Sequence, residues 1–124
     1  MRFALAVLAL VAPVAPSAHA QQAKTAPVTI EVVGAEPVRV RVAVGTTRPC
    51  DSDANKPLFN GVVKPGAAVS IPSDAICVCW EQTYAPFTTT GWSTPTVQCR
   101  PCSGLKKCIP RLDKPLRIVA RSKE

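Results

Sequence analysis

Residues 27–44 read PVTIEVVGAEPVRVRVAV, and this stretch decides the fold class. Valine and isoleucine occupy every second position over residues 28–32, and valine does so again over residues 38–44. The positions between them are mostly polar or charged. Alternation of β-branched and polar residues with a period of two predicts strands that have one buried and one exposed face. The Gly34-Ala35-Glu36 link predicts that these two strands form a hairpin.

Further short strands are predicted along the rest of the chain. Lys64-Pro65-Gly66 is typical of a tight turn, because proline presets φ and glycine tolerates a positive φ. The other predicted strands are residues 58–64, 67–71, 75–80 and 116–121. No long segment with a helical period follows residue 20. The sequence therefore predicts an all-β fold, a small disulfide-stabilised antiparallel β-sandwich or partly open barrel with a Cys-rich C-terminal segment.

The first twenty residues have the composition of a cleavable signal peptide. Arg2 supplies a positive charge, residues 3–15 are mainly apolar, and Ala18-His19-Ala20 matches an A-x-A cleavage signal. The apolar run is shorter than the roughly 20 residues that span a bilayer, and an N-terminal anchor that is never cut is the alternative. We expect one exported domain over residues 21–124, with a flexible start at 21–26 and no transmembrane segment after cleavage.

The composition also favours a bacterial source and an envelope location. The leader is rich in Ala, Val and Pro, and the chain contains no N-x-S/T glycosylation sequon. We therefore expect an exported protein, periplasmic or extracellular, and bacterial in origin.

Six cysteines, all of them beyond the leader, predict a disulfide framework in an exported chain. They are Cys50, Cys77, Cys79, Cys99, Cys102 and Cys108. Cys77 and Cys79 point to the same face of one predicted strand, about two strand steps apart, which is too far for a disulfide. Each should therefore bond a different partner, and Cys50 and the segment 99–108 are the natural suppliers. The full connectivity stays open at this point.

The cysteines could instead form a redox site or a zinc site. Cys99-Arg100-Pro101-Cys102 is a C-x-x-C motif that resembles the active turn of thioredoxin-type oxidoreductases, so a thiol–disulfide redox protein is the third functional interpretation. In that fold a long helix follows the motif, whereas only 22 residues remain here. The C-x-C and C-x-x-C pairs could also offer four thiolates to zinc. An oxidising compartment favours structural disulfides over both, and we expect no metal and no cofactor.

The region beyond the leader lacks the residues of a catalytic site. The only histidine, His19, would leave with the leader, so neither a Ser-His-Asp triad nor a Cys–His pair can form. Asp51, Asp53 and Asn55 faintly resemble a calcium loop, but Lys56 stands where that loop needs glycine. We therefore predict that the protein is not an enzyme.

Net charge is concentrated at the C-terminal end of the chain. The whole chain has a formal charge of +7; residues 21–98 contain six basic and six acidic residues, whereas residues 99–124 contain eight basic and two acidic ones. The predicted anion-binding residues are Arg100, Lys106, Lys107, Arg111, Lys114, Arg117 and Arg121. A basic surface fixed by disulfides would attract an acidic glycan, an anionic lipid headgroup or an envelope protein, and charge that merely aids solubility is the alternative. We do not expect a nucleic acid as partner, because no known binding module is present.

Residues 83–98 form a Thr-, Ser- and Pro-rich stretch that contains Tyr84, Phe87 and Trp92. Aromatic rings among hydroxyl groups on a long loop could bind a ligand or a partner protein, but we favour their folding back to cap one end of the sandwich. The sequence thus predicts a non-enzymatic exported envelope protein that acts by binding or assembly. The alternative is a small secreted enzyme inhibitor or effector-type protein that uses the 83–98 loop.

Overall fold

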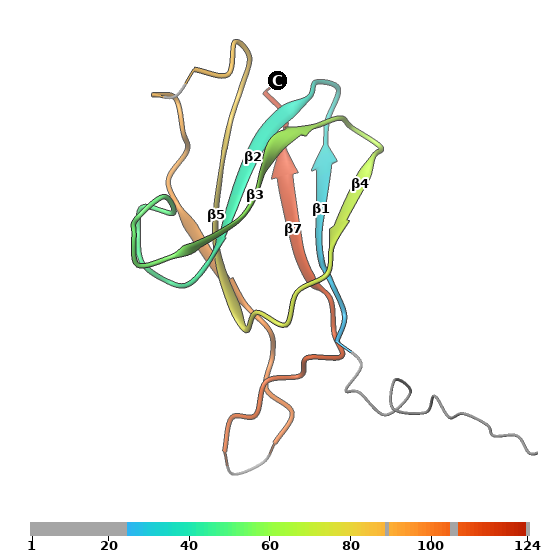
Figure 1. Cartoon of the computed structure of the whole chain (residues 1–124). Coiled ribbons are helices and arrows are strands. Elements are labelled where there is room, and N and C mark those ends of the chain that lie inside the picture. Colours follow the sequence, from blue (N-terminus) through green and yellow to red (C-terminus); the bar gives the residue numbers. More distant parts are fainter. Residues whose placement is uncertain (1–24, 89, 105–106, 124) are drawn as a thin grey trace, which may run out of the picture.

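The computed structural model describes residues 25–88, 90–104 and 107–123, so the predicted leader and residues 21–24 of the flexible start lie outside the described residues. Two β-sheets face each other across a common core (Figure 1). The strands are β1 (Val28–Val33), β2 (Val38–Val44), β3 (Lys56–Val63), β4 (Ala68–Ile71), β5 (Cys77–Thr83), β6 (Thr96–Cys99) and β7 (Leu116–Arg121). The predicted all-β sandwich is confirmed, and the two sheets do not close into a barrel.

One sheet has three strands in the order β4-β1-β7, and the other has four in the order β3-β2-β5-β6. Neighbouring strands run antiparallel except for β1 and β7, which pair in parallel from Val28 opposite Leu116 to Val33 opposite Arg121. Both of these strands start at the same end of the sandwich, where the Leu116 amide donates to the Pro27 carbonyl at 3.1 Å. The parallel pair is a departure from the antiparallel arrangement that the sequence predicts.

The core consists of the apolar positions of the alternating strands. Val28 and Ile30 of β1, Val38 and Val40 of β2, and Ile118 of β7 have no solvent exposure. Full burial of one such side chain contributes about 1.5–3 kcal/mol relative to leaving it in water. The period of two in the sequence therefore translates directly into the packing between the sheets.

The predicted hairpin between β1 and β2 is wrong, because these two strands lie in different sheets. The chain crosses between the sheets at Gly34, whose φ is +125°, and a Cβ atom at Gly34 would collide with the Ser122 side chain. The Ala35 amide donates to Ser122 Oγ at 3.1 Å and fixes this crossing. The alternation predicts one buried face on each strand, and that condition is also met when the two faces pack against each other.

The predicted turn at Lys64-Pro65-Gly66 is confirmed. The Ala67 amide donates to the Lys64 carbonyl at 3.1 Å, and Gly66 has a φ of +81°. The strands that the turn joins, β3 and β4, again belong to different sheets. The predicted loop 83–98 is shorter than expected, because Thr83 ends β5 and the last part of the loop forms β6 along the edge of the same sheet.

Candidate functional site

Three disulfides use all six cysteines. The pairs are Cys50–Cys79, Cys77–Cys99 and Cys102–Cys108. Separate partners for the two cysteines of β5, supplied by Cys50 and the segment 99–108, are therefore confirmed. The two cysteines of the C-x-x-C motif bond to different partners, so they do not form the shared disulfide of a thioredoxin-type turn. Three disulfides indicate an oxidising, exported environment.

Residues 100–115, here called the C-terminal loop, connect β6 to β7 and project from the lower end of the sandwich in Figure 1. Arg100, at its start, is only 4 % exposed. Its guanidinium donates to four backbone carbonyls, those of Ser73, Ala75, Leu112 and Lys114. Burial lowers the pKa of Arg100, and the charge of Asp74 partly opposes this. The expectation that Arg100 binds an external anion is therefore corrected, because its donors serve the protein's own backbone.

The outer part of the C-terminal loop consists of two arms, described at residues 101–104 and 107–111. Its two arms are joined by hydrogen bonds from the Arg111 amide to the Pro101 carbonyl (2.9 Å) and from the Ser103 amide to the Ile109 carbonyl (2.8 Å), and by a β-bridge between Cys102 and Pro110. The Cys102–Cys108 disulfide cross-links the same arms. Most of the described side chains on these two arms are exposed. The two arms thus present their side chains to solvent from a backbone that is cross-linked and hydrogen-bonded.

The other predicted anion-binding residues do not form one patch. Lys107, Arg111 and Lys114 lie on the C-terminal loop at the lower end, whereas β7 leads from Arg117 up to Arg121 near the C-terminus at the top of Figure 1. Lys106 lies outside the described residues. The predicted surface is therefore divided between the two ends of the sandwich.

Two of these cations are paired with carboxylates. Arg117 bonds Glu31 through Nε at 2.5 Å and Nη2 at 2.9 Å, and the hydrogen bond from Arg117 lowers the pKa of Glu31. Arg111 lies 3.4 Å from Asp113, whose pKa is lowered by the hydrogen bond from Arg111. Within the described part of the chain, Lys107 makes no ion pair, and the same is true of Lys114 and Arg121.

The aromatic residues of the 83–98 stretch do not share a surface either. Tyr84 is half-buried against the core, and its hydroxyl accepts a hydrogen bond from Gln82 Nε2 at 3.1 Å. Trp92 stacks on the guanidinium of Arg41, whose Cζ atom is 4.1 Å from the ring centroid. Phe87 is half-buried with a φ of 61°. Trp92 therefore covers the outer face of the four-stranded sheet, and does not cap an end of the sandwich as we expected.

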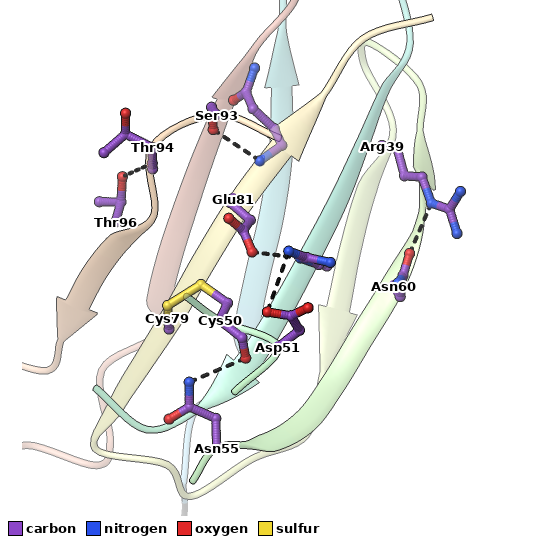
Figure 2. Close-up of polar contacts among 12 residues, drawn as sticks. Arg39, Cys50, Asp51, Asn55, Asn60, Cys79, Glu81, Ser93, Thr94 and Thr96 are labelled. Carbon is purple, nitrogen blue, oxygen red and sulfur yellow. Dashed lines mark hydrogen bonds and ion pairs between the residues drawn. A yellow bond between two sulfur atoms is a disulfide. The ribbon is translucent and has the colours of Figure 1, made fainter. Parts of the chain in front are cut away.

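Beside Trp92 lies a charge cluster that the sequence patterns do not predict. Glu81 is 2 % exposed and accepts a hydrogen bond from Arg41 Nε at 2.5 Å, while Asp51 lies 3.7 Å from Arg41 Nη2. Figure 2 shows Glu81 and Asp51 directed toward the same guanidinium group, with the Cys50–Cys79 disulfide alongside. The sequence does place Arg41 and Glu81, which have opposite charges, on outward positions of two strands. They can be recognised as an ion pair only once the pairing of β2 with β5 is known.

A hollow of about 350 Å³ lies next to this cluster. Its polar lining comes from Arg41, Asp51 and Asn60, and its apolar lining includes residues 57–59, where the register of β2 and β3 shifts by a β-bulge. Bulges often lie next to binding sites. Here, however, Arg41 is already neutralised by Glu81 and Asp51, so a ligand in the hollow would compete with two carboxylates for the same guanidinium. The exposed lysines of the C-terminal loop have no such competition among the described residues.

Asn55, part of the calcium-like string, has a structural role in the turn before β3. Its side-chain amide donates to the carbonyls of Thr47 and Cys50 at 2.7 and 3.2 Å. Among the described residues, no group of three or more His, Cys, Asp or Glu side chains is placed to bind a metal ion.

The fold and the covalent framework define this chain as a small two-sheet β protein with three disulfides. Comparison with protein-family models, with curated proteins and with solved structures finds no match. Over the part of the chain that the structure describes, no helix is long and apolar enough to cross a bilayer.

Proposed function

We propose that the chain is a non-enzymatic protein of the bacterial cell envelope, periplasmic or extracellular, that acts by binding an anionic partner through its C-terminal loop. The observation behind this proposal is that the loop presents exposed lysines on a fixed backbone. Lys107 lies next to Cys108 inside the loop that the Cys102–Cys108 disulfide closes, and Lys114 lies where its carbonyl accepts a hydrogen bond from Arg100. Cations on a backbone that is held in place lose little backbone entropy on binding, which favours a specific contact over diffuse attraction.

The charge distribution supports the same proposal. Residues 21–98 have no net charge, so the positive field of the protein originates beyond residue 98. Arg100 contributes its charge from within the fold, and Arg111 and Arg117 are partly neutralised by Asp113 and Glu31. The two described lysines of the C-terminal loop, Lys107 and Lys114, are therefore the described groups at the lower end that are most accessible to an anion.

Binding of the purified mature protein to heparin and to anionic lipid vesicles tests the proposal. We expect both affinities to fall steeply as the salt concentration rises, because exposed charges are screened beyond about 10 Å at 0.1 M salt. The double variant Lys107→Glu/Lys114→Glu should bind at least about tenfold more weakly, since each lysine near an anionic surface contributes about 1 kcal/mol.

The matched control is Arg121→Glu/Lys123→Glu, which changes the net charge by the same amount at the opposite end of the sandwich. It should retain near-normal affinity. Equal losses in the two double variants would mean that only the overall charge matters, and binding that does not respond to salt would also contradict the proposal.

A second candidate function, a secreted inhibitor or effector that uses the 83–98 loop, has one observation in its favour. The loop is closed at its base by Cys77–Cys99, and Ser93 is hydrogen-bonded to the backbone of Gln82 in both directions, at 2.8 and 3.2 Å. Replacement Trp92→Ala separates the two roles of this loop. A recognition loop would lose partner binding and keep its stability, whereas a covering loop would lose stability because Arg41 and Glu81 become exposed.

A further inference from the structure

We infer that the partner of the C-terminal loop is an anionic lipid surface, into which the loop inserts an apolar side chain between its lysines. This inference rests on the proposed function and narrows it from any anion to a bilayer or lipid assembly that has phosphate headgroups. The apolar side chain is that of Ile109, which none of the sequence patterns singled out.

Ile109 is 58 % exposed, which is more than the other large apolar residues that are exposed in the described part of the chain. Its carbonyl accepts hydrogen bonds from the backbone amide and the hydroxyl of Ser103, at 2.8 and 3.1 Å. The backbone at Ile109 is thereby fixed, and the side chain is left in solvent. A bulky aliphatic group held in this way, on a loop that projects beyond both sheets (Figure 1), can enter an apolar medium without unfolding the protein.

The charges around Ile109 match the headgroup layer of an anionic membrane. Lys107 precedes Ile109 by two residues, and Lys114 follows it on the same loop. In amphipathic membrane-binding segments, apolar side chains enter the boundary of the acyl chains while lysines reach the phosphates. A hydrated acidic glycan would satisfy the lysines but would offer Ile109 nothing apolar to contact. An exposed isoleucine beside lysines that make no ion pair among the described residues therefore favours a lipid surface over a glycan.

The root of the C-terminal loop extends the same apolar character. Ile76 is 48 % exposed and lies just before β5, where its carbonyl accepts the Arg100 amide at 2.9 Å. Asp113, an acidic residue of the loop, is bonded to Arg111. The described lower end thus combines two exposed isoleucines with cations and with two carboxylates, Asp113, which is bonded to Arg111, and Asp74, whose charge acts on Arg100.

The experiment measures binding to vesicles of phosphatidylglycerol and phosphatidylcholine, to vesicles of phosphatidylcholine alone, and to heparin. The unchanged protein should bind the anionic vesicles and heparin, and only weakly the neutral vesicles. Ile109→Ser should reduce the affinity for anionic vesicles about tenfold, as expected for withdrawing one aliphatic side chain from an apolar medium, and leave heparin binding unchanged. Val33→Ser, a matched change of an exposed apolar residue on the three-stranded sheet, should alter neither.

Insertion is measured directly with Ile109→Trp. Its fluorescence should shift to the blue on addition of anionic vesicles and should be quenched by lipids brominated along the acyl chain, whereas Val33→Trp should show neither effect. Circular dichroism of each variant confirms that the fold is retained.

The two proposals fail in different ways. If Lys107→Gln/Lys114→Gln lowers binding to vesicles and heparin alike while Ile109→Ser has no effect and Ile109→Trp does not shift, then the lipid inference is overturned and the anionic-partner proposal stands. A glycan or an acidic protein would then be the partner. If the lysine variant changes neither affinity, the proposed function itself is overturned.

Discussion

At the scale of single residues, Arg100 shows how a basic residue can serve the fold. A guanidinium has five N–H donors in a rigid plane, so it can bond several carbonyls that no regular strand pairing would satisfy. Those carbonyls come from the segment before β5 and from the end of the C-terminal loop. One side chain therefore joins two irregular segments that have little apolar surface of their own.

We predict that Arg100→Met lowers the free energy of unfolding by about 3 kcal/mol, because the substitution leaves one buried and three partly buried carbonyls without donors. Urea unfolding of the oxidised protein measures this loss. The control Arg117→Met removes an arginine whose side chain is 64 % exposed, and it should cost much less stability, because solvent screens an exposed ion pair. Similar losses in the two variants would contradict the structural role of Arg100.

At the scale of elements, the strand β7 illustrates how an open sandwich protects an edge. Its free edge is occupied by side chains of the opposite sheet. Gln82 Nε2 donates to the Arg121 carbonyl at 2.6 Å, Gln82 Oε1 accepts the Arg121 amide at 3.2 Å, and Gln98 Nε2 donates to the Arg117 carbonyl at 2.8 Å. These glutamines replace the backbone partner that a neighbouring strand would provide, so these backbone groups are not free to pair with a strand of another chain.

We expect Gln82→Met to lower stability by about 1–3 kcal/mol, because Gln82 is buried and both backbone groups of Arg121 lose their partner. Hydrogen–deuterium exchange should show faster exchange of the Arg121 amide. Gln98→Met serves as the control, since it should leave the Arg121 amide protected. Slow exchange of that amide in Gln82→Met would show that the glutamine does not protect the edge.

The ion pair between Arg117 of β7 and Glu31 of β1 predicts that the stability of the protein depends on pH. The hydrogen bond from Arg117 holds the pKa of Glu31 below its ordinary value of 4.5. A carboxylate with a lowered pKa stabilises the folded state above its unfolded pKa, and this contribution disappears as the pH falls through the folded pKa. Wild type should therefore lose stability below about pH 4.5 more steeply than Glu31→Gln, as measured by urea midpoints between about pH 7 and pH 3. Parallel curves for the two proteins would rule this contribution out.

At the scale of the whole molecule, the disulfides act on different parts of the structure. Cys50–Cys79 is buried and fixes the long connection between β2 and β3 onto the outer face of the four-stranded sheet. Cys102–Cys108 joins positions six residues apart and cross-links only the C-terminal loop. The first therefore stabilises the sandwich, and the second shapes the surface that we propose for binding.

Serine variants of these two pairs should differ in stability and in binding. A disulfide that closes a loop of 29 residues stabilises the folded state by about 3.5 kcal/mol through the entropy of the unfolded chain, and one that closes a loop of 6 residues does so by about 2 kcal/mol. Cys50→Ser/Cys79→Ser should therefore show the larger loss in urea unfolding. Cys102→Ser/Cys108→Ser should keep a cooperative transition near that of wild type but bind anionic vesicles more weakly. A larger loss of stability in the second variant would contradict this division of roles.

The sequence alone determined most of the strands, because alternation of valine with polar residues depends only on the burial of one face, but it did not determine β6 (Thr96–Cys99). It also determined that Cys77 and Cys79 need different partners, since strand geometry keeps neighbouring same-face residues too far apart for a disulfide. The basic character of the C-terminal end followed from counting charges. Each of these conclusions depends only on the identity of residues that are close together in the sequence.

Only the tertiary structure decided which strands pair, which cations are free and which apolar residues are exposed. Residues 27–44 form two strands in different sheets, because an apolar face can be buried equally well against a facing sheet. Arg100 and Lys107 look alike in sequence, but one is surrounded by carbonyls from distant segments and the other faces solvent. Exposure and pairing depend on which remote parts of the chain meet, and the alternation within one strand contains no information about that.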